Sequence, residues 1–209
     1  MHKVSVQWLE TQGYDASLHK EAAAMRYSPD HKALTHQRII KEAACLFRRD
    51  GIGATGLQPL MKSLGLTHGG FYAHFASKNE LVEKALQQAA YEVDGLCADI
   101  FSQPQPLHVF IDAYLSQWHV TSPHEGCPLP TMSAEMAQQG HASPTTDSVI
   151  NARLKQIEST LPGTEAQDQS IMIFASLVGA LVLARSAESD ALREQILDVT
   201  RKRLKQSVE

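Results

Sequence analysis

Residues 67–78 bring together side-chain types that can bind an anion or read a hydrogen-bonding edge. The segment combines two aliphatic hydroxyls, two imidazoles, a phenol and an ammonium group with two adjacent glycines, Gly69 and Gly70. Each glycine within a helix costs about 0.8–1 kcal/mol relative to alanine, so the pair needs a compensating role. Bare backbone at a helix N-terminus allows close approach to a phosphate or a base edge. Tight packing of this helix against its neighbours explains the pair equally well.

Three predicted helices must position this segment. Apolar spacing predicts a first helix over 35–50, and a second over 57–64 that ends at Gly65. Thr67 can cap a third helix that begins at His68, and Leu66 with Phe71 forms a hydrophobic staple at its start. Two short helices joined by a tight turn and braced by a longer helix are typical of a helix-turn-helix, whose second member fits the DNA major groove.

Helical spacing continues through the rest of the chain, and no alternating β pattern or internal repeat is present. Ser77 and Glu80 form a capping box that opens a long helix closed by Pro104. Further helices are predicted at 107–121, 128–139, 146–160, 166–186 and 189–206. The sequence therefore predicts an all-α protein with an N-terminal extension over 1–25, a three-helix helix-turn-helix head over 26–80 and a helical domain over 81–209.

The charge is distributed unevenly along the chain. The formal net charge is −4, but residues 26–80 hold eight Lys and Arg against four Asp and Glu, a local charge of +4. Residues 81–209 hold nine basic and sixteen acidic residues, a local charge of −7. This asymmetry favours a basic recognition module joined to an acidic domain with another role.

Composition argues against a membrane or secreted protein. The longest apolar run, 171–184, is shorter than the roughly 20 residues that span a bilayer. The first residues lack the apolar stretch of a secretory signal, and three cysteines are too few for a disulfide framework. These features favour the cytoplasm.

Catalysis is the main alternative class of function, and the sequence gives it no support. The chain has no nucleophile elbow, P-loop, dinucleotide-binding glycine motif or zinc-binding His-Glu-x-x-His helix. His119 and His124 are five residues apart across a predicted helix end, so they define no metal site. We therefore expect no enzyme activity, no cofactor and no bound metal. A helical interaction bundle would leave the basic head and its paired glycines unexplained.

Residues 35–86 resemble the TetR/AcrR family of transcriptional regulators. The resemblance rests on the segment 65–81, GLTHGGFYAHFASKNEL, and on the opening helix segment IIKEAACLF followed by Asp50 and Gly51. It implies a homodimer with a DNA-binding head and a C-terminal domain whose cavity accepts a small inducer. The expected function is a ligand-responsive repressor that binds a palindromic operator and is released by an inducer. Transcriptional activation is the alternative.

The resemblance also implies roles for individual residues. Phosphate contacts are expected from Thr67, Tyr72 and Lys78, and base contacts from His68, Gly69, Gly70 and His74. Gly56 occupies a position where the family often has a hydroxyl residue, so phosphate binding at the second helix falls to Thr55. A buried aromatic at Tyr72 and a surface imidazole at His74 remain alternatives.

The C-terminal helices carry candidate pocket and dimer residues. Pocket candidates are Tyr114, Trp118, His119, Met132 and Met136, on helices that the family uses for its cavity, although core packing accounts for most such residues. The helix over 166–186 is apolar nearly all round, so one side is expected to face the chain's own core and the other a partner. Gly179 and Ala180 would permit close approach there, and Leu181 is expected on the dimer face.

Cys127 is a candidate sensor because of its position. It precedes a predicted helix with Pro128 at the first helical position. A helix N-terminus lowers the pKa of a thiol, so electrophile or redox sensing through Cys127 is an alternative function. A small buried residue at a tight joint is the competing interpretation.

Overall fold

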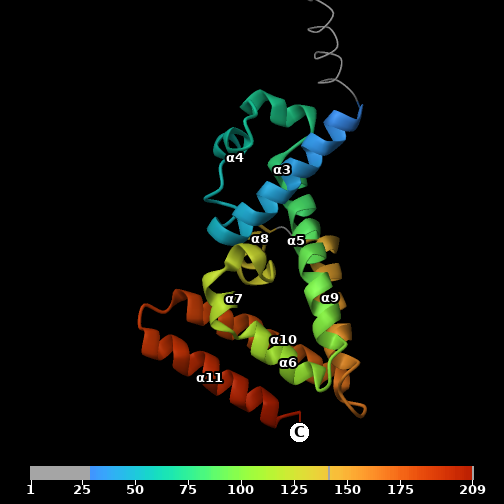
Figure 1. Cartoon of the computed structure of the whole chain (residues 1–209), viewed down its shortest axis with the longest axis vertical. Coiled ribbons are helices and arrows are strands. Elements are labelled where there is room, and N and C mark those ends of the chain that lie inside the picture. The colour runs from blue at the N-terminus through green and yellow to red at the C-terminus, as the bar shows by residue number, and fades with distance from the viewer. Residues whose placement is uncertain (1–28, 141, 209) are drawn as a thin grey trace, which may run out of the picture. The chain divides into compact units, whose positions relative to one another are not determined.

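The computed structural model describes residues 29–140 and 142–208, and over these residues the fold is all-α without a strand (Figure 1). The predicted extension 1–25 lies outside the described residues. The chain divides into two compact units, Met1–Arg38 and Ile39–Glu209. Helix α3, Pro29–Asp50, begins in the first unit and ends in the second.

The head is built from the end of α3, helix α4 (Leu57–Ser63), the 3-10 helix η1 (His68–Ala73) and the start of α5 (Lys78–Phe101). The predicted start signals are confirmed: the Thr67 hydroxyl accepts from the Gly70 N–H at 3.2 Å, and the Ser77 hydroxyl from the Glu80 N–H at 3.1 Å. In a capping box the Glu80 carboxylate would also accept from the N–H of the N-cap residue, Ser77. Here it accepts instead from the preceding N–H, that of Ala76, at 2.7 Å.

The helix predicted over 107–121 is two helices in the structure. Helix α6 spans Pro106–Tyr114, and α7 spans Gln117–Thr121. The break occurs because the Ser116 hydroxyl accepts from the His119 N–H and so caps a new helix. The 3-10 helix η2 (Pro123–Glu125) lies where no helix was predicted. The remaining helices lie close to the predicted ranges: α8 (Leu129–Gln138), α9 (Pro144–Glu158), α10 (Ala166–Ser186) and α11 (Asp190–Gln206).

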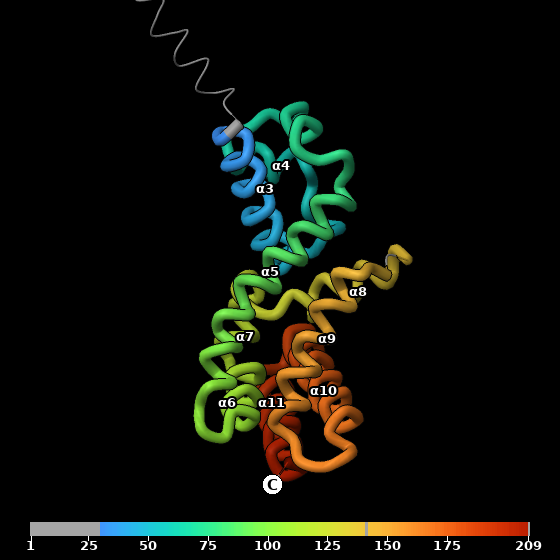
Figure 2. Tube along the Cα trace, turned by 90° about the vertical axis from the view of Figure 1, so that its right-hand side faces the viewer, coloured from blue at the N-terminus to red at the C-terminus, as the bar shows by residue number. Residues whose placement is uncertain are grey.

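Two apolar clusters organise this unit, and α5 belongs to both. The first half of α5 packs with α3, α4 and η1, together with Met132 and Met136 of α8. The second half of α5 packs in a cluster that draws on α6, α9, α10 and α11. Figure 2 shows α5 passing from α3 and α4 to α6. A displacement of either half of α5 therefore acts on both clusters.

Helix α10 has one buried side and one exposed apolar side. It packs against α8, α9 and α11 through residues that include Phe174, Leu177 and Leu181. Leu181 is fully buried, so the prediction that it lies on a dimer face is wrong. The exposed side of α10 and the neighbouring α11 present Ile171, Met172, Val182, Leu183, Leu192 and Val199. In the described part of the chain, α10 alone is long and apolar enough to cross a bilayer, a test that core helices also pass.

Candidate functional site

Residues 67–72 form an exposed surface at the helix-turn-helix. Thr67, His68 and Gly69 are exposed. Tyr72 is 63% exposed, and its ring meets the His68 ring edge-on at 6.1 Å. The interpretation of Tyr72 as a buried aromatic is therefore wrong, because Phe71 fills the core position beside it. His74 is half-buried, so contact with a base edge stays a prediction.

The structure separates the roles of the two glycines. A Cβ atom on Gly70 would lie 3.3 Å from Thr67 Oγ1, which is a tight intramolecular contact. A Cβ atom on Gly69 would meet nothing within 4 Å. Internal packing therefore gives a reason for glycine at position 70 but none at position 69.

A Gly69→Ala variant tests whether the open space at position 69 serves a ligand. We expect unchanged or slightly higher thermal stability, by up to about 1 kcal/mol, because alanine is favoured over glycine in a helix. We expect at least a tenfold loss of DNA affinity, since the added methyl group projects from the exposed surface. Fluorescence anisotropy measures the affinity. Gly95→Ala is the matched control, because its added Cβ atom on α5 also meets nothing within 4 Å. Equal DNA affinities of the two variants would contradict this role.

Lys78 holds the loop that precedes α4. Its ammonium group donates to the backbone carbonyls of Ile52 at 2.5 Å and Thr55 at 2.7 Å. It also lies 6.0 Å from the centre of the Phe47 ring. Partial burial lowers the pKa of Lys78, against an opposing effect of Glu135. Two of the three N–H bonds of Lys78 are thus engaged within the protein, and its phosphate contact stays a prediction.

Thr55 differs from its predicted role. Its side chain is buried, and its hydroxyl donates to the Gly51 carbonyl at 2.7 Å. Gly56 occupies the N-cap of α4 without a side-chain bond. The prediction that the Thr55 side chain contacts phosphate is therefore wrong, because folding the 51–56 loop turns that hydroxyl inward.

A Lys78→Met variant distinguishes a phosphate contact from a purely structural role. Loss of one phosphate contact lowers the slope of log affinity against log salt by about 0.9. We expect that change together with lower thermal stability, because the Ile52 and Thr55 carbonyls lose their donor. Anisotropy titrations across a salt series give the slope. Lower stability with an unchanged slope would mean that Lys78 only supports the loop.

Helix α8 is attached to the same loop by Glu135. The carboxylate accepts from the N–H groups of Ile52 at 3.0 Å and Gly53 at 2.6 Å. Gly51 has φ +93°, and a Cβ atom there would lie 2.3 Å from Glu135 Oε1, so this position requires glycine. Nothing in the local sequence indicated this bond between residues more than eighty apart.

Met132 and Met136 also attach α8 to the head. Both are buried in the first cluster, among side chains of α3, α4 and α5. The prediction that these methionines line a ligand pocket with Tyr114 is therefore wrong. Their thioether side chains fill the core beneath the helix-turn-helix instead.

Arg48 makes a second link between the head and the segment before α8. Its guanidinium, only 3% exposed, donates to the Gly126 carbonyl at 3.2 Å and forms an ion pair with Glu92 of α5. The Thr131 hydroxyl of α8 donates to the Arg48 carbonyl at 3.0 Å. Sequence reasoning placed Arg48 only in the basic charge of the head.

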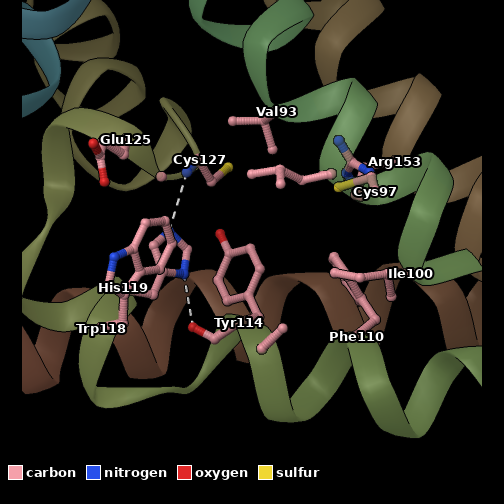
Figure 3. A pocket seen from close by; sticks show the side chains of 13 residues that line it. Val93, Cys97, Ile100, Phe110, Tyr114, Trp118, His119, Glu125, Cys127 and Arg153 are labelled. Atoms are coloured by element: carbon pink, nitrogen blue, oxygen red, sulfur yellow. Dashed lines mark hydrogen bonds between the residues drawn. The ribbon is translucent and has the colours of Figure 1, made fainter.

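A cavity of about 70 Å³ lies in the second cluster (Figure 3). Of the predicted pocket residues, Tyr114, Trp118 and His119 line it. The other lining residues come from α5, α6, η2 with the loop after it, and α9: Val93, Leu96, Cys97, Ile100, Phe110, Ala113, Glu125, Gly126, Cys127 and Arg153. Binding of a ligand there stays a prediction.

The His119 ring links Tyr114 of α6 to the segment Gly126–Cys127 that precedes α8. Its Nε2 atom accepts from the Cys127 N–H at 3.1 Å, so Nδ1 carries the proton and donates to the Tyr114 carbonyl at 2.7 Å. Burial lowers the pKa of His119 to about 4, and the ring is neutral at pH 7. A Cβ atom on Gly126 would lie 2.3 Å from the imidazole, so glycine is required for this contact.

Cys127 is not the activated thiol that its position suggested. The side chain is buried, and burial raises its pKa. Pro128 is the N-cap rather than the first helical residue, and α8 begins at Leu129. The predicted stabilisation of a thiolate is wrong, because loss of hydration outweighs the helix N-terminus. The described residues contain no group of three His, Cys, Asp or Glu side chains that could hold a metal ion.

Comparisons with known proteins agree with the helix-turn-helix geometry. Residues 39–85 match the family model of bacterial regulatory proteins of the tetR family. Mycobacterium tuberculosis HTH-type transcriptional regulator Rv0196 is 23% identical over 161 residues, 71% of this chain and 83% of that protein. Bacillus subtilis HTH-type transcriptional regulator LmrA is 23% identical over 168 residues, 74% of this chain and 88% of LmrA.

A solved structure shares the fold. A TetR transcriptional regulator from Chloroflexus aurantiacus superposes with a TM-score of 0.69 at 24% identity, covering 85% of this chain and 97% of that one. The fold and the helix-turn-helix define a DNA-binding transcriptional regulator rather than an enzyme. Residues 39–85 therefore form a DNA-binding domain of the tetR family of bacterial regulatory proteins.

Proposed function

We propose that this chain is a ligand-responsive repressor that binds a near-palindromic operator as a homodimer and leaves it when a small inducer binds. The observation that carries this proposal is the path from the cavity to the helix-turn-helix through α5 and Arg48. Activation of transcription would use the same parts, and the operator position relative to the promoter separates the two. The burial of Cys127 does not favour sensing through its thiolate.

The DNA-binding part of the proposal rests on the exposed surface of η1. Thr67 and Tyr72 would position the head on phosphates, while His68 and Gly69 would face base edges. The half-buried His74 and the N-cap contact of Gly70 lie beside them. In this arrangement, substitutions of His68 change the preference for particular DNA sequences. Substitutions of a phosphate-contacting residue change the affinity for all DNA sequences alike.

The homodimer part rests on the exposed apolar side of α10. Ala175, Ser176 and Gly179 are exposed at the centre of this side and let a second helix approach closely. Leu183, Leu192 and other apolar residues surround them. Pairing α10 and α11 with their copies in a second chain would form a four-helix interface.

Inducer release follows from the links around the cavity. Val93 and Cys97 of α5 line the cavity, and Lys78 at the start of α5 holds the 51–56 loop. Gly126 lines the cavity as well, and its carbonyl accepts from Arg48 in the head. A ligand that fits the cavity only after α5 or Gly126 has moved would favour a head arrangement that matches the operator poorly, and so lower the affinity.

Anisotropy titrations test the proposed function. The purified chain is titrated with duplex from immediately upstream of its own gene and with a scrambled duplex, across a salt series. Selective binding with a steep salt dependence and one dimer per duplex would support it. Equally weak binding to both duplexes, and to duplexes from random-sequence selection, would contradict it.

A further inference from the structure

We propose that the cavity binds a compact, neutral carbonyl compound, such as a small ketone or ester, whose oxygen accepts a hydrogen bond from the Tyr114 hydroxyl. The proposal deepens the proposed function, because this ligand would be the inducer.

Tyr114 supplies the donor that makes the cavity selective. Its side chain is 5% exposed, and among the residues that the structure describes no oxygen or nitrogen atom bonds its hydroxyl. The polar side chain beside it is the Cys127 thiol, whose sulfur is a weak hydrogen-bonding group that an oxygen acceptor on a ligand can replace. Figure 3 shows the hydroxyl directed into the cavity, toward Cys127. A buried hydroxyl without a partner is costly, so a ligand atom that satisfies it gains affinity. Burial also raises the pKa of Tyr114, which keeps the phenol protonated as a donor.

The cavity wall favours an acceptor over a donor on the ligand. The backbone carbonyls of Tyr114, His119 and Gly126 accept from His119 Nδ1, Arg185 and Arg48. The Glu125 carboxylate also lines the cavity, but its side chain is 58% exposed to solvent. A ligand hydroxyl or amide N–H inside the cavity would therefore compete for engaged acceptors. A carbonyl oxygen brings no donor of its own and needs only the Tyr114 hydroxyl.

The charged side chains that line the cavity, Arg153 and Glu125, are paired or exposed to solvent, which favours a neutral ligand: Glu125 is 58% exposed. Arg153 donates to Asp94 at 3.2 Å and to Gln156, and its guanidinium lies 5.7 Å from the centre of the Phe110 ring. Arg185 does not line the cavity, and its guanidinium donates to the His119 carbonyl. Two of its buried nitrogens have no partner within the described part of the chain. The remaining lining is mainly apolar, so an uncompensated ligand charge would lose hydration without a partner.

Cavity size limits the ligand to a few heavy atoms. The volume of about 70 Å³ is roughly half of the 150 Å³ that accommodates benzene in an engineered protein cavity. Leu96 and Trp118 are half-exposed, so the cavity has an entry between α5 and α7. A short branched ketone fits these limits.

Three molecules of matched size and shape test the proposal: butanone, 2-methyl-1-butene and propanoate. They present a carbonyl, a hydrocarbon and a carboxylate at the same position. Binding to the full chain is measured by ligand-observed NMR titration. We expect butanone to bind most tightly, and the Tyr114→Phe variant to weaken butanone about tenfold. Binding of 2-methyl-1-butene should change less than twofold, since it makes no hydrogen bond.

Several outcomes would overturn the proposal. These are tighter binding of propanoate, equal binding of butanone and 2-methyl-1-butene, or no saturable butanone binding at millimolar concentrations. If Tyr114→Phe does not fold, Ala113→Leu fills the cavity from α6 and should abolish butanone binding. All of these readouts use the protein without DNA. A failure of operator binding would therefore refute the proposed function and leave the cavity chemistry to be judged separately.

Discussion

A Leu183→Glu chain is expected to be a folded monomer that has lost most of its operator affinity. Leu183 is 58% exposed on the apolar side of α10, so the substitution removes little from the chain's own core. In a dimer through this side, each copy would bury an unpaired carboxylate, which is strongly unfavourable. Loss of the second head removes an avidity gain on the order of 10²-fold or more.

Sedimentation equilibrium and anisotropy measure the two effects of Leu183→Glu. The matched variant is Leu181→Ala, two residues along α10 and fully buried. It should cost about 2–5 kcal/mol of folding free energy while its folded fraction still dimerises. A dimeric Leu183→Glu chain with intact operator affinity would show that this side of α10 is not the interface.

An Arg48→Met variant is expected to lose about 2–4 kcal/mol of stability and to detach the head from the Gly126 turn. The guanidinium donates hydrogen bonds to the Gly126 carbonyl, the Glu92 carboxylate and the Ala44 carbonyl of its own helix. Methionine keeps the buried volume but leaves these acceptors without their donor. The loss falls short of that for a fully buried pair, because the Glu92 side chain is 35% exposed.

Denaturant unfolding and amide hydrogen exchange test the Arg48 variant. We expect faster exchange over residues 126–132, because the Gly126 carbonyl loses its donor and only the bond from the Thr131 hydroxyl to the backbone carbonyl of residue 48 still links this segment to position 48. Arg49→Met is the matched control, since Arg49 is exposed and pairs only with the adjacent Asp50 among the bonds described. Equal stability and exchange in the two variants would rule out Arg48 as a link between head and cavity.

The sequence predicted those parts of the head that depend on neighbours within a few residues. The Thr67 and Ser77 caps each bond a backbone N–H three residues ahead, so their type and spacing were sufficient. The motif over 65–81 added the resemblance to the TetR family, which the family model matches over residues 39–85, because the caps, aromatic residues and lysine occur in order. Local signals also predicted most helix boundaries. The exceptions include the start of α3, at Pro29 and not at residue 35, and Ser116, which starts α7 within an apolar stretch.

The sequence by itself thus determined the helices and the helix-turn-helix with its resemblance to the TetR family, whereas only the tertiary structure decided which way several side chains face. Thr55 turns inward, Met132 joins the head, and Cys127 is buried. The partners that decide these positions come from distant segments: Glu135 bonds residues 82 and 83 positions away, and Arg48 bonds Gly126, 78 positions away. Helical periodicity identifies an apolar face, but the element that covers that face depends on how the whole chain packs.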